Sequence, residues 1–342
     1  MSRLTTISEI IEQLGEPKFR LKQIQEGIFQ KNYTLYSQIP NIGKKLKDEI
    51  ISVLGDEILT IKKLNEVQGD NAHKVLFHTK DNHHLEAVRL QYKNHAALCI
   101  SSQAGCALAC TFCATGAIGL KKNLTSDEII DQVLWFQKQG LPIDRIIFMG
   151  MGEPFSNPLN VFESLEMMVV GKDCLHLSPR RISVSTVGIV PGMTKLTKEF
   201  PNINLAFSLH SPFSDQRLSL MPITRAYPIE KVFVAIDDHL KITNHKVFIS
   251  YVLMKDINDS IEHATVLAEL IRQTPDRLRL CHINLIRYNP GPSLTAYQRP
   301  DRDKIDRFME ILENNRVHHT LRQDFGLKIA AACGQLAASA KP

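Results

Sequence analysis

The stretch that decides the fold is Cys106-Ala-Leu-Ala-Cys110-Thr-Phe-Cys113, three cysteines with the spacing C-x3-C-x2-C. Thiolates this close together can converge on one soft-metal centre, because sulfur ligands favour zinc, Cu(I) or iron–sulfur clusters over hard cations. A [4Fe–4S] cluster and a structural zinc site each normally take four protein ligands. A set of three leaves one metal position open, and an open position is where substrate chemistry occurs. The alternative is a structural site completed by a distant cysteine.

The loop that follows, Ala114-Thr-Gly-Ala-Ile-Gly119, favours the open site, because its glycines let the backbone approach a ligand closely. The two cysteines that could complete a structural site, Cys174 and Cys281, stand far away in the sequence and are interpreted as structural residues.

Composition sets outer bounds on function. The 342 residues suffice for one large α/β domain with an appendage or for two domains. Seven cysteines, an odd number clustered toward one site, argue against a secreted disulfide framework and suit the reducing cytoplasm. No apolar run is long enough to cross a membrane, and the polar start lacks a signal-peptide core. The net charge of +5 permits a nucleic-acid partner without demonstrating one.

Residues 1–80 are predicted to form a basic helical accessory domain, with helical periodicity at 7–14, 20–30 and 44–54. Its basic side chains are Lys18, Arg20, Lys22, Lys31, Lys44, Lys45 and Lys47. They would form either an ordinary solvated surface or a contact with a phosphate backbone. Residues 81–94 continue an alternating pattern and are predicted to form a linking β-hairpin.

From about residue 95 the chain alternates between strand and helix patterns. Strands are expected at residues 98–101, 145–149, 181–186, 204–209, 246–252 and 282–286. Helices are expected at residues 126–138, 159–170, 192–199, 229–240, 260–272 and 302–314. This alternation predicts parallel pairing through right-handed crossovers, in an incomplete barrel of about six units. Chemistry in such barrels collects at the carboxyl ends of the strands.

Polar side chains do follow several of these strands. Gly152 and Glu153 end the second strand, and the glutamate offers a carboxylate to a cationic group such as an ammonium. Ser185, Ser208, His210 and Asn289 stand at or after later strands. Each alone is weak evidence, since Glu153 could end a turn and His210 could be structural. Together they describe a polar small-molecule site beside the metal.

Two lone cysteines also stand out. Cys99 lies on the first predicted barrel strand, where a cysteine is usually a small buried hydrophobe. Cys333 lies in a segment of small residues beside a glycine near the C-terminus, a setting that suits an accessible, reactive thiol.

These residues resemble the radical S-adenosylmethionine (SAM) superfamily and, more narrowly, its RlmN/Cfr family of rRNA adenosine methyltransferases. The resemblance rests on five segments in family order: Ser101–Cys106, Phe112–Gly116, Phe148–Glu153, Ser208–His210 and Ala331–Leu336. It covers nearly the whole chain. It implies an α/β fold, a partial (β/α)6 TIM-like barrel over residues 95–325 with an N-terminal helical accessory domain. A C-terminal segment, residues 326–342, would carry the reactive cysteine.

By the same resemblance, Cys106, Cys110 and Cys113 would hold a [4Fe–4S] cluster whose open iron binds SAM. The positions that match SAM contacts in the family are Gly152, Glu153, Ser185, Ser208, Leu209, His210 and Asn289. Two SAM molecules would be used per turnover.

The family mechanism also implies roles for the lone cysteines. One SAM methylates Cys333, and a radical made from the second takes a hydrogen from that methyl group. The methylene radical then adds to an adenine carbon. Deprotonation and attack by Cys99 on the Cys333 sulfur release the methylated RNA and a transient disulfide, which cytoplasmic reductants reset. Glu86 matches the proton acceptor; the alternative is a solvent-facing strand glutamate.

Most segments resemble the Cfr branch, which methylates C8 of adenosine 2503 in 23S rRNA and confers resistance to antibiotics of the peptidyl transferase centre. Pro154 after Glu153 resembles the RlmN branch, which methylates C2 and in some cases tRNA. The resemblance further implies a cytoplasmic monomer that acts on precursor or free 23S rRNA with an electron donor such as flavodoxin. The other classes considered are a non-catalytic RNA-binding Fe–S protein, which would not need both Cys99 and Cys333, and a small-molecule radical SAM enzyme.

Overall fold

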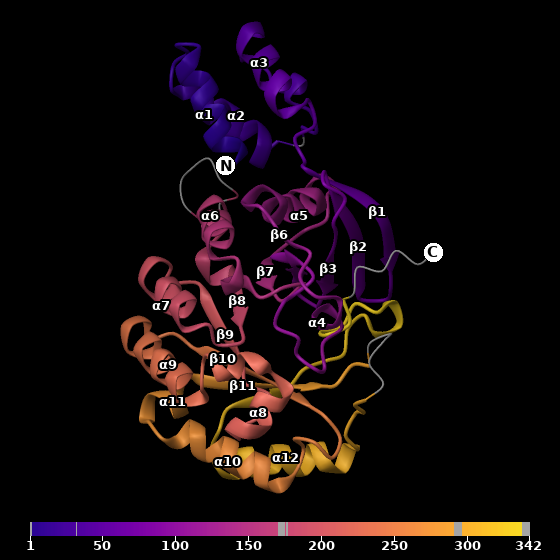
Figure 1. Cartoon of the computed structure of the whole chain (residues 1–342), viewed down its shortest axis with the longest axis vertical. Coiled ribbons are helices and arrows are strands. Elements are labelled where there is room, and N and C mark those ends of the chain that lie inside the picture. The colour runs from indigo at the N-terminus through magenta and orange to yellow at the C-terminus, as the bar shows by residue number, and fades with distance from the viewer. Residues whose placement is uncertain (1, 32, 170–174, 176, 291–295, 337–342) are drawn as a thin grey trace.

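The computed structural model of the chain describes residues 2–31, 33–169, 175, 177–290 and 296–336. Within these ranges the main sheet has ten strands, in the order β1-β2-β3-β4-β7-β8-β9-β10-β11-β12. Figure 1 shows the helices α6, α7, α9, α10 and α12 following one side of this sheet around its curve. The arrangement confirms the predicted α/β class.

Seven neighbouring strands of the sheet pair in parallel. They are β4 (Ala96–Cys99), β7 (Arg145–Phe148), β8 (Ile182–Thr186), β9 (Asn204–Ser208), β10 (Val247–Leu253), β11 (Cys281–Arg287) and β12 (His319–Leu321). The first six confirm the predicted barrel strands to within two residues at each end. The short β12 was not predicted. Parallel pairing brings all the carboxyl ends to one rim, where the candidate residues stand.

Helices connect these strands. The six predicted ones are α5 (Ser126–Lys138), α6 (Pro158–Val169), α7 (Val190–Glu199), α9 (Ile229–Thr243), α10 (Ile261–Arg272) and α12 (Arg302–Asn314). Short helices that were not predicted are α4 (Ala114–Ile118), α8 (Ser214–Leu220) and α11 (Pro275–Leu280), with 3-10 turns at Tyr36–Gln38, Pro154–Ser156, Pro179–Arg181, Pro222–Arg225 and Leu327–Ile329. The start of α5 is fixed by a capping box, in which the Thr125 hydroxyl accepts from the Glu128 amide (3.2 Å) and the Glu128 carboxylate accepts from the Thr125 amide (2.9 Å).

Three antiparallel strands extend the sheet beside β4. They are β1 (Ile61–Gln68), β2 (Ala72–Thr79) and β3 (His84–Gln91), and β3 pairs with β4. A hairpin is therefore present as β2–β3, but only β3 lies within the predicted residues 81–94. The strands β1 and β2 lie in residues 1–80, which were assigned to the helical domain, and β1 was not predicted. Only the first residue of β1 is buried, so this edge strand shows no apolar alternation. A separate two-stranded sheet, β5 (Gln103–Ala104) with β6 (Lys122–Asn123), lies beside the cysteine loop.

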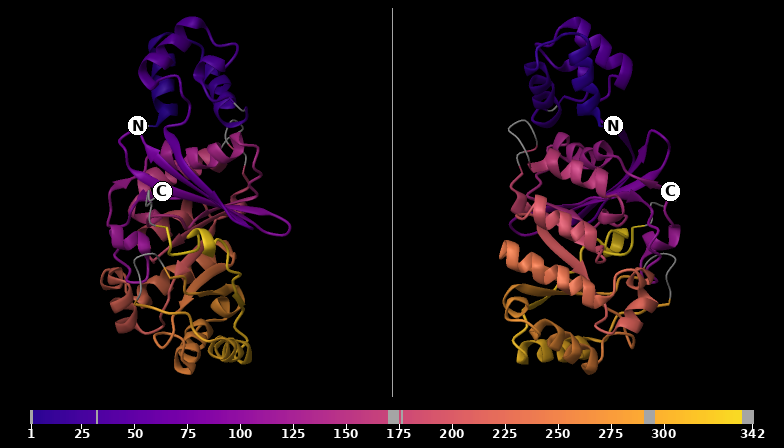
Figure 2. Two further views of the ribbon diagram at one scale, coloured as in Figure 1. Left: turned by 90° about the vertical axis from the view of Figure 1, so that its right-hand side faces the viewer. Right: turned by 60° about the vertical axis from the view of Figure 1, so that its left-hand side comes forward.

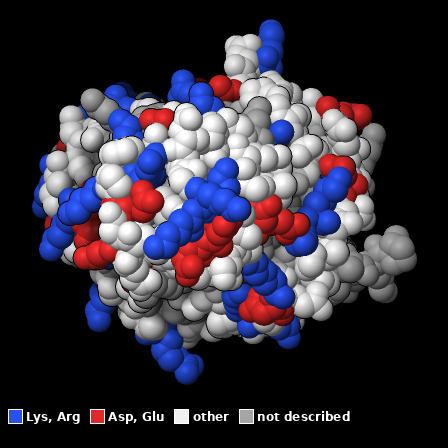
Figure 3. Space-filling view, turned by 90° about the horizontal axis from the view of Figure 1, so that it is seen from above, with Lys and Arg blue, Asp and Glu red and all other residues white. Residues whose placement is uncertain are grey.

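The predicted N-terminal helices are present as α1 (Arg3–Gln13), α2 (Phe19–Phe29) and α3 (Lys44–Leu54). They pack on the barrel, since Arg3 forms buried ion pairs with Asp127 (2.8 Å) and Asp131 (2.5 Å) of α5. Residues 1–80 contain twelve Lys or Arg and ten Asp or Glu, so acidic side chains nearly balance the basic ones in this module. Figure 3 shows both signs of charge interspersed on this end of the molecule.

The C-terminal segment lies between the antiparallel strands and the far end of the barrel, shown in yellow in Figure 2. Ala331 and Leu336 are buried in a small cluster with Ala72, Val88 and Met151. The segment is also hydrogen-bonded near the cysteine loop, because the Ala114 amide donates to the Gly334 carbonyl (2.9 Å) and the Thr115 hydroxyl to the Leu336 carbonyl (2.6 Å). Cys333 is therefore held close to that loop.

Among the helices of the described ranges, none has both the length and the apolar character required to span a bilayer.

Candidate active site

The three clustered cysteines lie in the loop between β4 and α4. Gly105 shapes this loop: its φ of 77° is left-handed, and a Cβ there would lie 1.9 Å from the Gly119 carbonyl oxygen. The Cys106 amide donates to the same Gly119 carbonyl (3.2 Å), which closes the loop. The Cys113 amide donates to the Cys110 carbonyl (3.1 Å), so the last two cysteines share one tight turn.

The three thiols lie within electrostatic reach of one another. Burial raises the pKa of Cys106 to about 11, and the charges of Cys113 and Glu153 add to the shift. Burial, followed by Cys113 and Cys106, also raises the pKa of Cys110. As free thiols Cys106 and Cys110 would hold their protons at neutral pH, and a bound metal would displace those protons.

The donor set fits a cubane cluster better than a single ion. Among the described residues, no group of three His, Cys, Asp or Glu side chains is arranged to hold one metal ion. A [4Fe–4S] cluster makes a different demand, because each cysteine binds a separate iron. Three neighbouring soft thiols in one loop fit three of the four irons and leave one iron open to a ligand.

The end of β7 is locked against the segment that precedes the cysteines. Gly152 has a φ of 93°, and a Cβ there would lie 2.5 Å from the Cβ of Gln103. The Gln103 side-chain oxygen, Oε1, accepts a hydrogen bond from the Glu153 backbone amide (2.9 Å). Glycine at this position therefore lets the second strand end lie directly beside the cysteine loop.

The Glu153 carboxylate is buried at this strand end. It accepts hydrogen bonds from the Thr186 hydroxyl (2.7 Å), the Phe155 amide (3.1 Å) and the Val187 amide (3.0 Å). Burial raises its pKa to about 7, against the effect of these donors. A cationic ligand nearby would favour the ionised form.

A cavity of about 170 Å³ opens at this rim and collects most of the predicted SAM-contacting residues. Those that line it are Gly152, Glu153, Ser185, Ser208, His210 and Asn289, together with Cys113 and Cys333. Leu209 does not line it: its side chain is fully buried, and its amide donates to the Ser250 carbonyl (3.0 Å). The structure thus brings six of the seven residues to one cavity beside the cysteine loop.

His210 takes the left-handed conformation, with a φ of 59°. Its Nδ1 accepts a hydrogen bond from the Val252 amide (3.0 Å), and its ring packs edge-on against Phe112 at 5.0 Å. Burial, with Arg217 adding to the effect, lowers its pKa to about 3. His210 is therefore a neutral wall of the cavity.

A larger cavity of about 470 Å³ contains both lone cysteines, Cys99 from β4 and Cys333 from the C-terminal segment. The two cavities share Met149, Ile286, Asn289 and Cys333. Cys333 is exposed, and the Asn289 side-chain amide donates to its carbonyl (3.4 Å). Burial, with Cys333 adding to the effect, raises the pKa of Cys99 to about 12. Cys333 thus stands where the two cavities meet.

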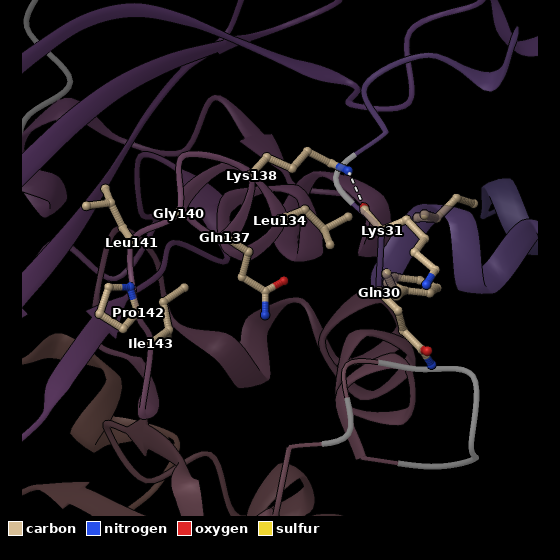
Figure 4. A pocket seen from close by; sticks show the side chains of 11 residues that line it. Gln30, Lys31, Leu134, Gln137, Lys138, Gly140, Leu141, Pro142 and Ile143 are labelled. Atoms are coloured by element: carbon tan, nitrogen blue, oxygen red, sulfur yellow. Dashed lines mark hydrogen bonds between the residues drawn. The ribbon is translucent and has the colours of Figure 1, made fainter. Parts of the chain in front are cut away.

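Another cavity, of about 360 Å³, lies between the end of α2, the end of α5 and residues 140–143 (Figure 4). Lys138 crosses it and donates to the Lys31 carbonyl (3.4 Å). Its lining residues, all within the described ranges, include none of the candidate site residues.

Comparison with known proteins decides the family. The radical SAM superfamily matches residues 100–268. Over 332 residues the chain is 43% identical to the ribosomal RNA large subunit methyltransferase Cfr of Staphylococcus warneri, covering 96% of this chain and 95% of that protein. The chain belongs to the Cfr family of radical SAM enzymes. The Cfr protein of Lachnoclostridium phytofermentans is 39% identical and covers 98% of this chain and 97% of its own length.

The fold of this Cfr family member also matches a solved structure. The crystal structure of a radical SAM methyltransferase from Sphaerobacter thermophilus superposes with a TM-score of 0.90 at 35% identity, covering 98% of each chain. The predicted radical SAM fold is confirmed, and the cofactors of the family are a [4Fe–4S] cluster and SAM.

In this Cfr family member the Glu86 side chain is buried on β3 rather than solvent-facing, so the alternative interpretation is wrong. Its Oε1 pairs with Lys74 Nζ at 3.0 Å. Lys74 Nζ also donates to the Ala330 carbonyl (3.1 Å), three residues before Cys333. By strand alternation Glu86 shares a face with Val88 and Leu90, which line the larger cavity.

The remaining cysteines lie elsewhere. Cys281 is buried in the core on β11, as expected for a structural residue. Cys174 lies outside the described residues.

Two arginines near the site were missed from the sequence. Arg217 of α8 is fully buried and donates to backbone carbonyls at the ends of β8 and β9. Arg322 follows β12 and lines the larger cavity. Neither stands in a recognisable motif, and both follow or lie on short elements that show no clear periodicity. A buried arginine can be found only once the neighbours of these elements are known.

Proposed function

We propose that this protein methylates C8 of adenosine 2503 in 23S rRNA, with Cys333 as the carrier of the methyl group. The Cfr relatives are named as ribosomal RNA large subunit methyltransferases, which supports the RNA substrate. The observation that carries the proposal is the position of Cys333, which lines the cavity beside the cysteine loop and the cavity of Cys99 at once. A thiol in that place can take a group in one cavity and deliver it in the other.

In this proposal the smaller cavity binds both cofactors. Cys106, Cys110 and Cys113 hold three irons of the cluster. The walls that bind SAM are Gly152, Glu153, Ser185, Ser208, His210 and Asn289. Leu209, which the resemblance also assigns to SAM binding, is buried behind this wall and supports it. A bound SAM would supply a methyl group to Cys333, and a second SAM, together with the cluster, would supply a hydrogen-abstracting radical.

The larger cavity receives the adenine. Its volume of about 470 Å³ suits a base turned out of its stack, and Val88, Leu90 and Phe325 supply apolar walls to its faces. Adenine C8 does not react with the methyl group of SAM directly, because that carbon is not nucleophilic. A carbon carried on the Cys333 sulfur and activated by hydrogen abstraction can bond to it.

Release of the product requires an electron acceptor, a proton acceptor and a second thiol. The adduct formed by the methylene radical would return its unpaired electron to the bound cluster, which supplied one electron when SAM was cleaved. Glu86, which pairs with Lys74 at 3.0 Å, accepts the proton lost from the ring carbon. The Cys99 thiolate then attacks the Cys333 sulfur. A sulfur–sulfur bond forms, the sulfur–methylene bond breaks, and its electron pair stays on the carbon, which takes up a proton to become the methyl group. Thiol reductants reduce the resulting disulfide and restore both cysteines.

The expected setting follows from the family. The substrate would be precursor or free 23S rRNA, since the target nucleotide is enclosed in the finished ribosome. The enzyme would work as a cytoplasmic monomer with an electron donor such as flavodoxin. The methylated nucleotide would confer resistance to antibiotics that bind the peptidyl transferase centre.

The test is mass mapping of adenosine 2503 from host cells that lack their own methyltransferases for this nucleotide. Expression of the protein should give 8-methyladenosine, and Cys333→Ala should abolish it. Cys281→Ala, a matched cysteine outside both cavities, should leave the modification in place. Only 2-methyladenosine would assign the RlmN-type reaction instead, and an unmodified nucleotide would contradict the proposal.

A further inference from the structure

The larger cavity contains a half-buried arginine with no carboxylate partner. Arg322 lines it together with Cys99 and Cys333. Within the described part of the chain, no Asp or Glu forms an ion pair with it. The nearby Asp324 is already engaged, with Arg287 at 3.0 Å and Arg299 at 3.0 Å. A half-buried cation without a counterion is energetically unfavourable. An anion that forms in this cavity would therefore be stabilised by the charge of Arg322.

The side chain of Arg322 is held in place on several sides. Its own amide donates to the Leu285 carbonyl (2.8 Å), and its Nη1 lies 3.9 Å from the Met149 sulfur. Tyr92 lines the same cavity and interacts with the charge of Arg322. Tyr92 is itself fixed between His95, stacked at 4.5 Å, and Phe325, edge-on at 4.7 Å. The guanidinium therefore has a defined position in the cavity.

The two thiols, Cys99 and Cys333, line the same cavity as this guanidinium. Burial alone would lower the pKa of Arg322, yet Cys333, Tyr92 and Cys99 together raise it. In return, Arg322 opposes the rise that burial and Cys333 impose on the pKa of Cys99. Thiol–disulfide exchange requires a thiolate as the attacking group, and burial makes that thiolate hard to form.

We propose that Arg322 is the residue that stabilises the Cys99 thiolate while it attacks the Cys333 sulfur. The inference rests on the proposed function, whose last step is that attack. The step itself is unchanged: Cys99 gives its electron pair to the Cys333 sulfur, and the methylene carbon keeps the pair of the broken bond and takes a proton. Arg322 acts indirectly, through Cys99. It offsets the negative charge of the Cys99 thiolate before that charge passes to the methylene carbon.

Other charged groups near Cys99 are accounted for. Those that line the cavity with it are Tyr92, Arg322, Asp324 and Cys333. On the strands that flank β4, Glu86 is paired with Lys74, Arg89 donates to the Pro142 carbonyl (3.0 Å), and Arg145 is exposed. Arg322 is thus the cation whose charge opposes the rise in the pKa of Cys99.

The test is the pH profile of iodoacetamide alkylation, read at Cys99 by fragment-ion mass spectrometry on the full chain without cofactors or RNA. Arg322→Gln should raise the apparent pKa of Cys99 by about one unit, which slows its alkylation about tenfold at a pH below that value. Arg322→Lys keeps the charge and should stay close to the wild type. Arg89→Gln, which removes another buried arginine, should have no effect on Cys99.

An unchanged Cys99 profile in Arg322→Gln would overturn the inference, and so would equal slowing in the Gln and Lys variants, which would indicate altered access rather than lost charge. During turnover Arg322→Gln should accumulate protein covalently joined to RNA, visible on a denaturing gel. The alkylation result does not depend on RNA methylation. Absence of 8-methyladenosine with wild-type protein would refute the proposed function and leave the Cys99 measurement standing.

Discussion

Replacing Arg217 with methionine should loosen the wall of the smaller cavity, the one that is proposed to bind SAM. The guanidinium donates to the carbonyls of Val187 (2.6 Å), Ser208 (3.0 Å) and Leu209 (3.0 Å), and to the Thr224 hydroxyl (2.7 Å). Methionine has a similar length and no donors, so the three carbonyls would lose these partners. A buried acceptor without a partner costs at least about 1 kcal/mol, or about 3 kcal/mol for three. Removal of a buried charge recovers part of this, which leaves an expected net loss of about 2 kcal/mol.

The functional effect follows from where those carbonyls lie. Ser208 and His210, two residues further on, line the smaller cavity. Displacement of these strand ends should therefore weaken SAM binding. A tenfold rise in the dissociation constant corresponds to about 1.4 kcal/mol, and we expect an effect of that order. The assays are urea unfolding of the cluster-free chain and isothermal titration of SAM into the reconstituted protein.

The matched control for this prediction is Arg302→Met. Arg302 is exposed and pairs with Asp306 one turn along α12, so its loss should change the unfolding free energy by less than about 0.5 kcal/mol. The reasoning would be refuted if Arg217→Met bound SAM as tightly as the wild type and unfolded at the same urea concentration as the control.

Three further outcomes can be measured. Arg3→Met leaves Asp127 and Asp131 of α5 buried without their cation, and it should lower the free energy of unfolding in urea by about 3–5 kcal/mol. A loss below about 1 kcal/mol would show that the N-terminal helices do not depend on these ion pairs. Burial lowers the pKa of His239 from 6.5 to about 4. Its contribution to stability, about 3 kcal/mol, is therefore complete above pH 6.5 and is lost as the pH falls through 4. His239→Gln should flatten the acid limb of a plot of unfolding free energy against pH, and an unchanged limb would contradict this. Gly105→Ala places a Cβ against backbone at 1.9 Å and should reduce the iron bound after reconstitution severalfold, and full iron content would show that the loop tolerates the change.

The alternating strand and helix patterns were sufficient to place the barrel, because each crossover pairs an apolar strand with an amphipathic helix. The strand β1 was missed because it is an exposed edge with charged residues along its length. The strand β12 was missed because three residues are too few to show a period. Arg322 follows that short strand, so its approach to the two thiols depends on tertiary contacts alone.

For the candidate site too, the sequence indicated some features and could not reveal others. Motif spacing indicated the three clustered cysteines, and the parallel sheet brought most of the strand-end residues to their rim. What the sequence could not reveal is that Cys333, more than two hundred residues after the cluster, lies between two cavities. Likewise the sequence left open whether Glu86 is a proton acceptor or a solvent-facing residue, and only the structure shows its buried pair with Lys74.

The central claim is that Cys333 carries the methyl group, and the most direct test is the mass of its peptide. Protein purified from cells that supply SAM should carry an added methyl group on Cys333, placed there by fragment ions, and the Cys281 peptide should be unmodified. In Cys99→Ala the carbon should remain bound, so that Cys333 is found joined to the adenosine after nuclease digestion. An unmodified Cys333 in both proteins, together with a methylated adenosine in the RNA, would contradict the account.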